Sequence, residues 1–336
     1  MRRGREGRCD GDPRQVGSIS GHGPIHDVGV QVRDPRERRL SKQRNPVVFG
    51  GLAVDGLNIA YREAGDPVNP KLVLLHGFPS PSHQHRDLIR ALSDDFHLIA
   101  PDYPGFGLSD TPDPATFPYT FDRIAEIIGR FLSLKGFHRY GLFVHDYGGP
   151  VGFRLIDANP DALEWLIVQN SNAYEVGFTP AWQGLRAQWE RRTAETDAPL
   201  RGLLARETIK AIYLHGARHP ELMSPDAWES DIAFLQRPNA ERLHLDLFFD
   251  YRTNIPLYPK WQASLRERQP ETLILWGQGD MFFTPQGGEA YLADLPSAEL
   301  HRLDTGHFAV EDQLDYVATR MRGFYAERVE ERVAVG

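Results

Sequence analysis

The fold is decided by the stretch Tyr140-Gly141-Leu142-Phe143-Val144-His145-Asp146-Tyr147-Gly148-Gly149-Pro150-Val151-Gly152. Its first part, residues 140–144, is apolar and rich in residues that favour β-strands. Small residues then allow a helix to pack closely against that strand, namely Gly148, Gly149 and Gly152. The pattern predicts a strand, a sharp turn at Asp146 and a helix. Such a turn projects its central side chain beyond the carboxyl edge of a sheet.

Asp146 stands at the centre of this turn, and a carboxylate is ionised at neutral pH. A serine in the same place needs a histidine to remove its proton before it attacks an ester or amide carbonyl. A carboxylate needs no such step, but its attack on a carbonyl gives an anhydride as reactive as the substrate. Attack on a saturated carbon that carries an epoxide oxygen or a halide gives an alkyl ester, which water can cleave. The alternative interpretation of Asp146 is a helix N-cap.

Apolar, β-prone runs recur along the chain and alternate with helical patterns. A hairpin is expected at Asp55-Gly56, between strands at 47–54 and 57–62. A helix at 121–132 is indicated by apolar residues at three- and four-residue spacings. This alternation predicts an α/β protein with a mostly parallel sheet flanked by helices. Further strands are predicted at 71–75, 96–100, 140–144, 165–169, 272–276 and 299–303.

Residues 171–262 interrupt the alternation, because strand patterns vanish there and helical stretches mix with proline, glycine and aromatic residues. We interpret this segment as a helical cap that is inserted between two strands and lies over the site. Residues 45–170 and 263–336 then form the core. Four of the six tryptophans fall in the cap, where they either line an apolar pocket or join the cap to the core: Trp182, Trp189, Trp228 and Trp261.

Residues 1–44 differ in composition from the rest, with ten Arg and one Lys against six acidic residues. Few large apolar residues and frequent glycine predict a disordered tail; a wrongly assigned translation start is the alternative. The whole chain carries a net charge of −8, so the part after the tail is acidic, which argues against a nucleic-acid partner. No apolar run reaches membrane-spanning length, and Cys9 is the single cysteine. We therefore expect no membrane partner and a reducing, cytoplasmic setting.

Two polar residues follow predicted strands near the end of the chain. Asp280 comes after the strand at 272–276, and His307 comes after the strand at 299–303. Because the carboxyl ends of parallel strands meet at one edge of a sheet, both side chains should lie close to Asp146. We expect His307 to activate the water that cleaves the ester, and Asp280 to orient His307.

The loop after the strand at 71–75 reads His76-Gly77-Phe78-Pro79. The backbone N–H groups of Phe78 and Tyr147 are expected to hold the oxyanion that forms when water attacks the ester. His76 and Pro79 are expected beside the substrate. The alternative interpretation of this loop is an ordinary strand-to-helix turn.

Taken together, residues 45–336 resemble the α/β-hydrolase superfamily. The order Asp146, Asp280, His307 matches the order of nucleophile, acid and base in that fold. The resemblance implies a small apolar organic substrate, water as second substrate, and no metal or organic cofactor. Three motifs are similar to those of the branch that contains epoxide hydrolases and haloalkane dehalogenases: His76-Gly77-Phe78-Pro79, Gly105-Phe106-Gly107-Leu108-Ser109 and His145-Asp146-Tyr147-Gly148-Gly149.

The chain also departs from these families. Tyr147 stands where both usually have a tryptophan, whose N–H holds the halide in dehalogenases, and Phe78 replaces a halide-binding asparagine. Val144, in place of the usual elbow glycine, is instead dehalogenase-like. Epoxide hydrolases protonate the opening oxygen with two cap tyrosines, and Tyr251 resembles the second of them. Trp189 lies near the place of the first, and a Trp189–Tyr251 pair also resembles the halide pocket of fluoroacetate dehalogenases.

The leading interpretation is an epoxide-hydrolase-like enzyme that converts an epoxide to a diol, with Tyr174 and Tyr213 as further pocket residues. The alternative is a haloalkane dehalogenase, which releases an alcohol and a halide. A cofactor-free oxygenase, a luciferase-like protein and a non-catalytic relative form a different class, and a non-catalytic relative is expected to lose triad residues that this chain keeps. A plain esterase is disfavoured because no serine occupies the turn.

Overall fold

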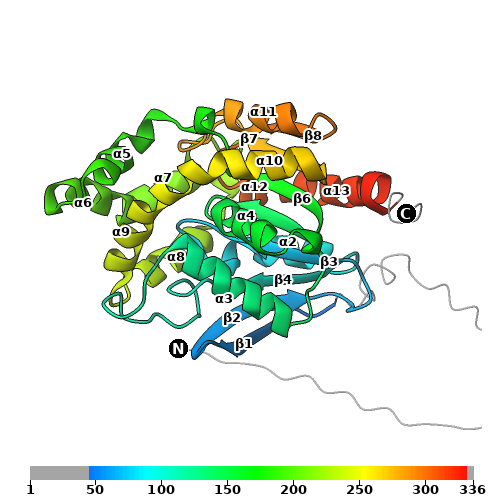
Figure 1. The fold of residues 1–336 in the computed structure, drawn as a ribbon, viewed down its shortest axis with the longest axis horizontal. Coiled ribbons are helices and arrows are strands. Elements are labelled where there is room, and N and C mark those ends of the chain that lie inside the picture. The colour runs from blue at the N-terminus through cyan, green and yellow to red at the C-terminus, as the bar shows by residue number, and fades with distance from the viewer. Residues whose placement is uncertain (1–44, 331–336) are drawn as a thin grey trace, which may run out of the picture. The chain divides into compact units, whose positions relative to one another are not determined.

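The computed structural model describes residues 45–330, and their centre is one sheet of eight strands (Figure 1). The strand order is β1-β2-β4-β3-β5-β6-β7-β8, and only the pairs β1–β2 and β2–β4 are antiparallel. All eight predicted strands are confirmed, and so is the mostly parallel sheet. The tail predicted at 1–44 lies outside the described residues. The strands are β1 (Val48–Val54), β2 (Leu57–Ala64), β3 (Lys71–Leu75), β4 (His97–Pro101), β5 (Tyr140–His145), β6 (Leu163–Gln169), β7 (Glu271–Gly277) and β8 (Glu299–Leu303).

The register of the parallel strands brings their carboxyl ends to one edge. Leu75 of β3 pairs with Val144 of β5, His145 pairs with Gln169 of β6, and Gly277 of β7 pairs with Leu303 of β8. The residues that directly follow these positions therefore lie side by side along that edge, as expected for an α/β sheet. This edge is where the predicted site residues fall.

Helices cover both faces of the sheet, and each face has its own apolar core, because alternate strand residues point to opposite sides. One core joins Leu72, Leu74 and Phe143 to α2 and α13, and the other joins Val73, Leu75 and Val144 to α3, α4 and α11. The helix predicted at 121–132 is confirmed as α3, which starts after Thr120, whose hydroxyl accepts from the Arg123 amide. The core helices are α2 (Arg86–Leu92), α3 (Phe121–Leu134), α4 (Gly148–Ala158), α11 (Pro285–Asp294), α12 (Ala309–Asp312) and α13 (Leu314–Phe324), with short helices η1 (Ser82–His85), η2 (Pro160–Ala162) and η9 (Tyr325–Glu330).

The segment between β6 and β7, called the insertion below, contains residues 170–270 and is largely helical (Figure 1). None of residues 170–270 belongs to a strand. Phe178 of the insertion forms one isolated β-bridge with Phe283, which lies after β7. Its helices are α5 (Gln183–Glu190), α6 (Ala194–Leu200), α7 (Arg206–Leu214), α8 (Pro225–Leu235), α9 (Ala240–Asp250) and α10 (Tyr258–Arg268), with short helices η3 (Glu175–Gly177), η4 (Pro180–Trp182), η5 (Arg201–Leu204), η6 (Pro220–Leu222), η7 (Tyr251–Thr253) and η8 (Ile255–Leu257).

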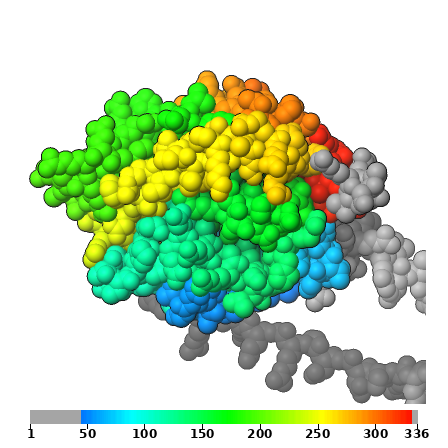
Figure 2. Space-filling view, in the orientation of Figure 1, coloured from blue at the N-terminus to red at the C-terminus, as the bar shows by residue number. Residues whose placement is uncertain are grey.

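Helix α10 packs against the core helices α4 and α11 as well as against the insertion. Trp261 of α10 stacks on Phe153 of α4 with ring centroids 5.1 Å apart. In the space-filling view α10 lies between the orange α11 and the green α4 (Figure 2). The boundary predicted at residue 262 therefore falls inside a helix that also packs against the core. Within residues 45–330, no helix combines the length and the apolar character that crossing a membrane requires.

Candidate active site

Asp146 occupies the sharp turn between β5 and α4. Its φ of 49° lies in the left-handed region, which a non-glycine residue adopts only when the surrounding structure holds it there. Close packing around the turn demands glycine at two positions. A Cβ on Gly77 would lie 2.4 Å from Cβ of Asp146, and a Cβ on Gly148 would lie 2.5 Å from the Leu75 carbonyl oxygen. The turn predicted from the sequence is thus present, with Asp146 at its apex.

The carboxylate of Asp146 is held by backbone amides. Oδ1 accepts a hydrogen bond of 2.6 Å from the backbone N–H of Phe78. The backbone N–H of Tyr147 also contributes a hydrogen bond to this carboxylate, and Asp146 is 5% exposed. Burial raises the pKa of Asp146 to about 6, against the lowering influence of the His307 charge and of the Phe78 and Tyr147 amides. At neutral pH the carboxylate is therefore mostly ionised, and backbone amides hold it in place.

His307 and Asp280 form a buried pair at the same sheet edge. Nδ1 of His307 donates to Oδ2 of Asp280 at 2.8 Å, and the two residues are 1% and 7% exposed. Burial acts to lower the pKa of His307, but the charge and hydrogen bond of Asp280, with the charge of Asp146, outweigh it, so the pKa is raised. Nε2 of His307 has no hydrogen-bond partner in the described part of the chain. This nitrogen is free to accept a proton from a water molecule.

The Asp280 carboxylate is held by two further N–H groups. The amide of Phe282 donates to Oδ1 at 2.7 Å, and Nδ2 of Asn170 donates to Oδ2 at 2.8 Å. Asn170 is itself fixed on β7, since its Oδ1 accepts from the Gly277 amide at 2.8 Å. Sequence reasoning missed Asn170, although its place directly after β6 is the same signal that identified the other site residues.

A second polar layer holds the backbone of His307. Its carbonyl oxygen accepts from Nε2 of His145 at 3.0 Å and from Nε2 of Gln169 at 2.8 Å. Nε2 of Gln84 lies 3.1 Å from Nδ1 of His145, which assigns the acceptor role to that ring nitrogen and the proton to the other. Burial lowers the pKa of His145 well below its usual value, so its ring is neutral. These residues were also missed from the sequence, because buried polar side chains look like ordinary core positions there.

A narrow cavity is lined by Asp146 and has a volume of about 20 Å³, within a larger space of about 330 Å³ that includes open solvent. Four of its lining residues come from the insertion and four from the core. Most of the lining is apolar or aromatic, as is usual for a site that takes a small organic molecule. The lining residues are Phe78, Asp146, Tyr147, Trp182, Leu185, Leu203, Phe248 and Phe282.

This fold and site can be compared with known proteins. A model of the alpha/beta hydrolase fold family matches residues 70–314, more than half of the chain. The chain belongs to the α/β-hydrolase family. The uncharacterized hydrolase YNR064C of Saccharomyces cerevisiae is 37% identical over 277 residues, covering 81% of this chain and 95% of that protein. A cis-3-alkyl-4-alkyloxetan-2-one decarboxylase of Shewanella oneidensis is 30% identical over 281 residues, covering 78% and 83%.

Solved structures share the same fold. The haloalkane dehalogenase DbeA from Bradyrhizobium elkani superposes with a TM-score of 0.70 at 20% identity, covering 85% of this chain and 100% of that one. The epoxide hydrolase CorEH superposes with a TM-score of 0.68 at 20% identity, covering 84% and 99%. The family match confirms the expected superfamily, and these two structures share its fold.

Tyr251 and Trp189, predicted in the pocket, lie behind its wall. Tyr251 is fully buried, and its ring lies 4.7 Å from that of Trp182 and 6.1 Å from that of Tyr147. Its hydroxyl is enclosed without a hydrogen-bond partner among residues 45–330. Trp189 stacks on Tyr251, and its indole N–H donates to the Phe248 carbonyl at 2.8 Å. Neither residue lines the cavity, in contrast to our expectation.

The other expected pocket residues serve the packing of the fold. The Tyr174 hydroxyl donates to Oδ2 of Asp294 at 2.7 Å. Nε2 of His76 accepts from the Tyr103 amide at 3.0 Å, and the two rings stack. Pro79 is buried beside Phe78 but does not reach the cavity lining. Tyr174 and His76 differ from expectation because the Tyr174 hydroxyl and Nε2 of His76 find partners away from the cavity.

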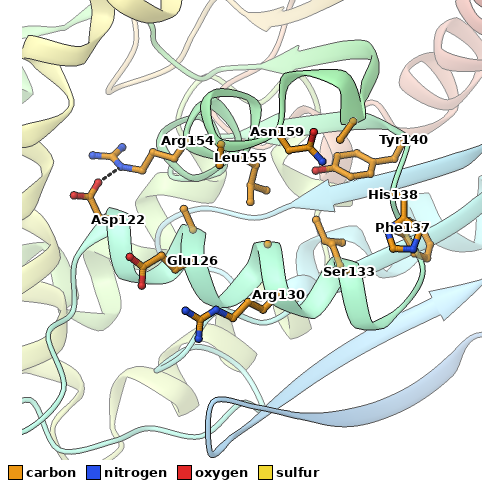
Figure 3. A pocket seen from close by; sticks show the side chains of 15 residues that line it. Asp122, Glu126, Arg130, Ser133, Phe137, His138, Tyr140, Arg154, Leu155 and Asn159 are labelled. Atoms are coloured by element: carbon orange, nitrogen blue, oxygen red, sulfur yellow. Dashed lines mark hydrogen bonds and ion pairs between the residues drawn. The ribbon is translucent and has the colours of Figure 1, made fainter.

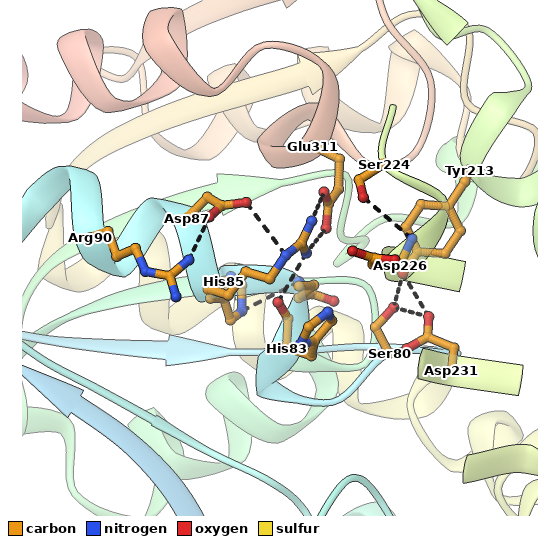
Figure 4. Close-up of polar contacts among 12 residues, drawn as sticks. Ser80, His83, His85, Asp87, Arg90, Tyr213, Ser224, Asp226, Asp231 and Glu311 are labelled. Carbon is orange, nitrogen blue, oxygen red and sulfur yellow. Dashed lines mark hydrogen bonds and ion pairs between the residues drawn. The ribbon is translucent and has the colours of Figure 1, made fainter. Parts of the chain in front are cut away.

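Tyr213 belongs to a polar cluster that joins the insertion to the core (Figure 4). Its hydroxyl and that of Ser80 both lie 2.6 Å from Oδ2 of Asp231, and the two hydroxyls are 2.7 Å apart. Burial raises the pKa of Asp231 to about 7. The Tyr213 ring stacks on Phe308 at 4.0 Å, directly beside His307 in the chain. Tyr213 thus connects α7 to the loop that carries His307 and does not line the cavity.

A wider hollow lies between α3 and α4 (Figure 3). Figure 3 shows Asp122 and Arg154 paired at one end of it. None of Asp146, Asp280 and His307 lines this hollow, so it is separate from the chemical site. Its size alone therefore carries no functional conclusion.

Proposed function

We propose that the protein is a hydrolase that opens an epoxide through a covalent ester on Asp146 and releases a diol. The observation that carries this proposal is the arrangement of the Asp146 carboxylate. The Phe78 amide holds the carboxylate through Oδ1 at 2.6 Å, and Asp146 lines an apolar cavity. A buried, mostly ionised carboxylate in this position suits attack on a saturated carbon of a small apolar substrate.

In the first step Oδ2 of Asp146 attacks one carbon of the epoxide ring. The bond between that carbon and the ring oxygen breaks, and its electron pair goes to the oxygen, which then needs a proton. The product is an alkyl ester of Asp146 with a hydroxyl on the neighbouring carbon. The apolar lining excludes water during this step, which strengthens the attack by an otherwise solvated carboxylate.

In the second step water cleaves the ester. Nε2 of His307 accepts a proton from water, and Asp280 stabilises the resulting positive charge through Nδ1. The hydroxide attacks the carboxyl carbon of Asp146, so negative charge develops on Oδ1. This oxygen already accepts from the Phe78 amide, which supports Phe78 as an oxyanion donor together with the Tyr147 amide. Collapse of this intermediate releases the diol, which takes its proton from His307.

An oxygen leaving group fits the cavity better than a halide does. Halide release without protonation needs N–H donors that face the leaving atom. The indole N–H of Trp182 donates to the Phe282 carbonyl at 2.8 Å, and that of Trp189 donates to the Phe248 carbonyl. Both indoles are thus engaged by the backbone, which favours epoxide opening over the haloalkane alternative.

A second candidate substrate is a four-membered cyclic ester, an oxetan-2-one. It is favoured by the relative that is a cis-3-alkyl-4-alkyloxetan-2-one decarboxylase, 30% identical over most of both chains. Attack of Asp146 on the saturated ring carbon next to oxygen would release a carboxylate. Loss of CO₂ from that carboxylate, with departure of Asp146, would then give an alkene. This route needs no water and hence no base at His307, so the two candidates differ in a testable way.

The test traps the ester. The variant His307→Gln is incubated with terminal epoxides, haloalkanes and oxetan-2-ones, and peptide mass spectrometry locates any adduct, with Asp146→Asn as control. We expect an adduct on Asp146 from an epoxide, and diol from the parent protein. An adduct from haloalkanes alone, or alkene formation that survives His307→Gln, would replace the epoxide by the corresponding substrate. If no compound modifies Asp146, the proposal fails and a non-hydrolytic protein is favoured.

A further inference from the structure

The polar groups of the cavity wall are few. Of its eight lining residues, five present only hydrocarbon side chains: Phe78, Leu185, Leu203, Phe248 and Phe282. A sixth, Trp182, has its N–H engaged by a backbone carbonyl at 2.8 Å. The Asp146 carboxylate is an acceptor. The Tyr147 hydroxyl is therefore the one side-chain donor in this lining that is not already engaged.

The Tyr147 ring is held firmly in place. It is 4% exposed and meets Phe121 edge-on, with centroids 5.0 Å apart and planes at 82°. Its backbone is already helical, with φ −60° and ψ −20°, at the first turn of α4. Within residues 45–330 the hydroxyls of Tyr103 and Tyr251 are enclosed without a partner, and the Tyr147 hydroxyl is not among such enclosed groups. Burial and the Asp146 charge raise the pKa of Tyr147 well above 10, so it keeps its proton.

Tyr251 is the proton donor expected from the sequence, but it lies away from the cavity. Its hydroxyl is completely enclosed, and the residue does not line the cavity. Its ring lies behind that of Tyr147, with centroids 6.1 Å apart. Tyr251 therefore supports the inner wall, whereas Tyr147 belongs to the surface that meets the substrate.

We propose that the hydroxyl of Tyr147, and not that of Tyr251, donates the proton to the leaving oxygen when Asp146 opens the ring. This inference rests on the proposed function. As the carbon–oxygen bond breaks, the ring oxygen takes the electron pair and the Tyr147 proton, which leaves a phenolate. Ester hydrolysis restores it: one water proton reaches the diol through His307, and the other is left on the Asp146 carboxyl group, which returns it to Tyr147. One residue thus serves both steps, with its hydroxyl in the first and its amide in the second.

A phenol as proton donor determines which kind of leaving atom the site can serve. A phenol protonates an alkoxide that is forming, whereas a halide departs without a proton. The chemical class implied is therefore a substrate whose leaving atom is a poorly acidic oxygen, as in a simple alkyl epoxide. Epoxides with electron-withdrawing substituents leave a more stable alkoxide and should depend less on this donor.

The experiment isolates ring opening in the His307→Gln background, where the ester cannot be hydrolysed. Rapid quenching and mass spectrometry give the rate of ester formation on Asp146 from a terminal alkyl epoxide. Adding Tyr147→Phe removes the hydroxyl and keeps the ring and amide, and should slow this rate by about 100-fold or more. Tyr251→Phe should leave the rate within about fivefold, as should Tyr103→Phe, which deletes another buried unpartnered hydroxyl.

The outcomes separate this inference from the function it rests on. A smaller loss in Tyr147→Phe for epoxides with electron-withdrawing substituents would support a proton donor rather than a packing role. Ester formation in Tyr147→Phe at nearly the parental rate, or an equal loss in Tyr251→Phe, would overturn the assignment while the covalent mechanism stands. Absence of ester in His307→Gln itself would overturn the proposed function.

Discussion

Replacing Asp280 by asparagine should stop the cycle at the ester. Three N–H groups point at this carboxylate: Nδ1 of His307 and Nδ2 of Asn170, both at 2.8 Å from Oδ2, and the Phe282 amide at 2.7 Å from Oδ1. An ionised carboxylate accepts all three. An asparagine has one acceptor oxygen, so in either orientation its own NH₂ faces at least one of these donors.

The surroundings cannot easily adapt to this change. Asn170 is unable to turn over, since its Oδ1 accepts from the Gly277 amide and its Nδ2 also donates to the Gly277 carbonyl. An unsatisfied buried donor costs about 1–3 kcal/mol. With its NH₂ turned toward His307 and Asn170, the asparagine opposes two donors and forces the His307 proton onto Nε2, which can then no longer accept a proton from water. With its NH₂ turned toward the Phe282 amide, it opposes one donor. In both orientations no negative charge remains to stabilise the His307 imidazolium. We expect ester hydrolysis to slow by roughly 10³–10⁴-fold, the scale of the equivalent change in other triads.

Attack by Asp146 does not use this base, so ester formation should stay within about tenfold of the parent. Rapid-quench mass spectrometry of Asp280→Asn should therefore show the ester forming and persisting. Asp294→Asn is the matched control, because Asp294 is equally buried at 7% but binds Tyr174 and Arg266 away from the cavity. Hydrolysis in Asp280→Asn within tenfold of the parent, or an equal loss in the control, would refute the reasoning.

Four further outcomes are expected. Single turnover in heavy-oxygen water should place the label in the Asp146 side chain, and Asp146→Asn should abolish turnover; unlabelled carboxylate in the parent would contradict the ester. The rate of ester formation should fall about tenfold per pH unit below about pH 6, because Asp146 with its raised pKa then becomes protonated and cannot attack; a flat rate between pH 6 and 4 would oppose this. Gly77→Ala should lower ester formation by roughly 100-fold, since its Cβ would lie 2.4 Å from that of Asp146 and displace the carboxylate; unchanged kinetics would show that the turn adapts. Tyr213→Phe should reduce the free energy of unfolding in urea by about 1–3 kcal/mol through loss of its bond to Asp231, with an unchanged denaturation midpoint as the contrary result.

The local sequence pattern was sufficient to predict the architecture and the site residues at the edge of the sheet. Strands such as 71–75 and 272–276 are recognisable because a strand covered on both faces selects β-prone apolar residues over a short range. Once these strands are parallel, their carboxyl ends meet, and the residues that follow them are brought together whatever the connecting segments do. Asp146, Asp280 and His307 were identified in this way, and the structure brings the last two into a hydrogen bond.

Only the tertiary structure decided which residues of the insertion line the cavity. Helices of the insertion are recognisable in the sequence, but the direction in which each side chain points depends on the partner that its polar group finds. Tyr174 is turned to Asp294, Tyr213 to Asp231, and the indole of Trp189 to a backbone carbonyl, so none of them reaches the cavity. These partners are distant in sequence, and satisfying buried polar groups is a property of the packed molecule rather than of any local segment. The site residues of the sheet edge follow from chain order, whereas the contribution of the insertion to the cavity follows from packing.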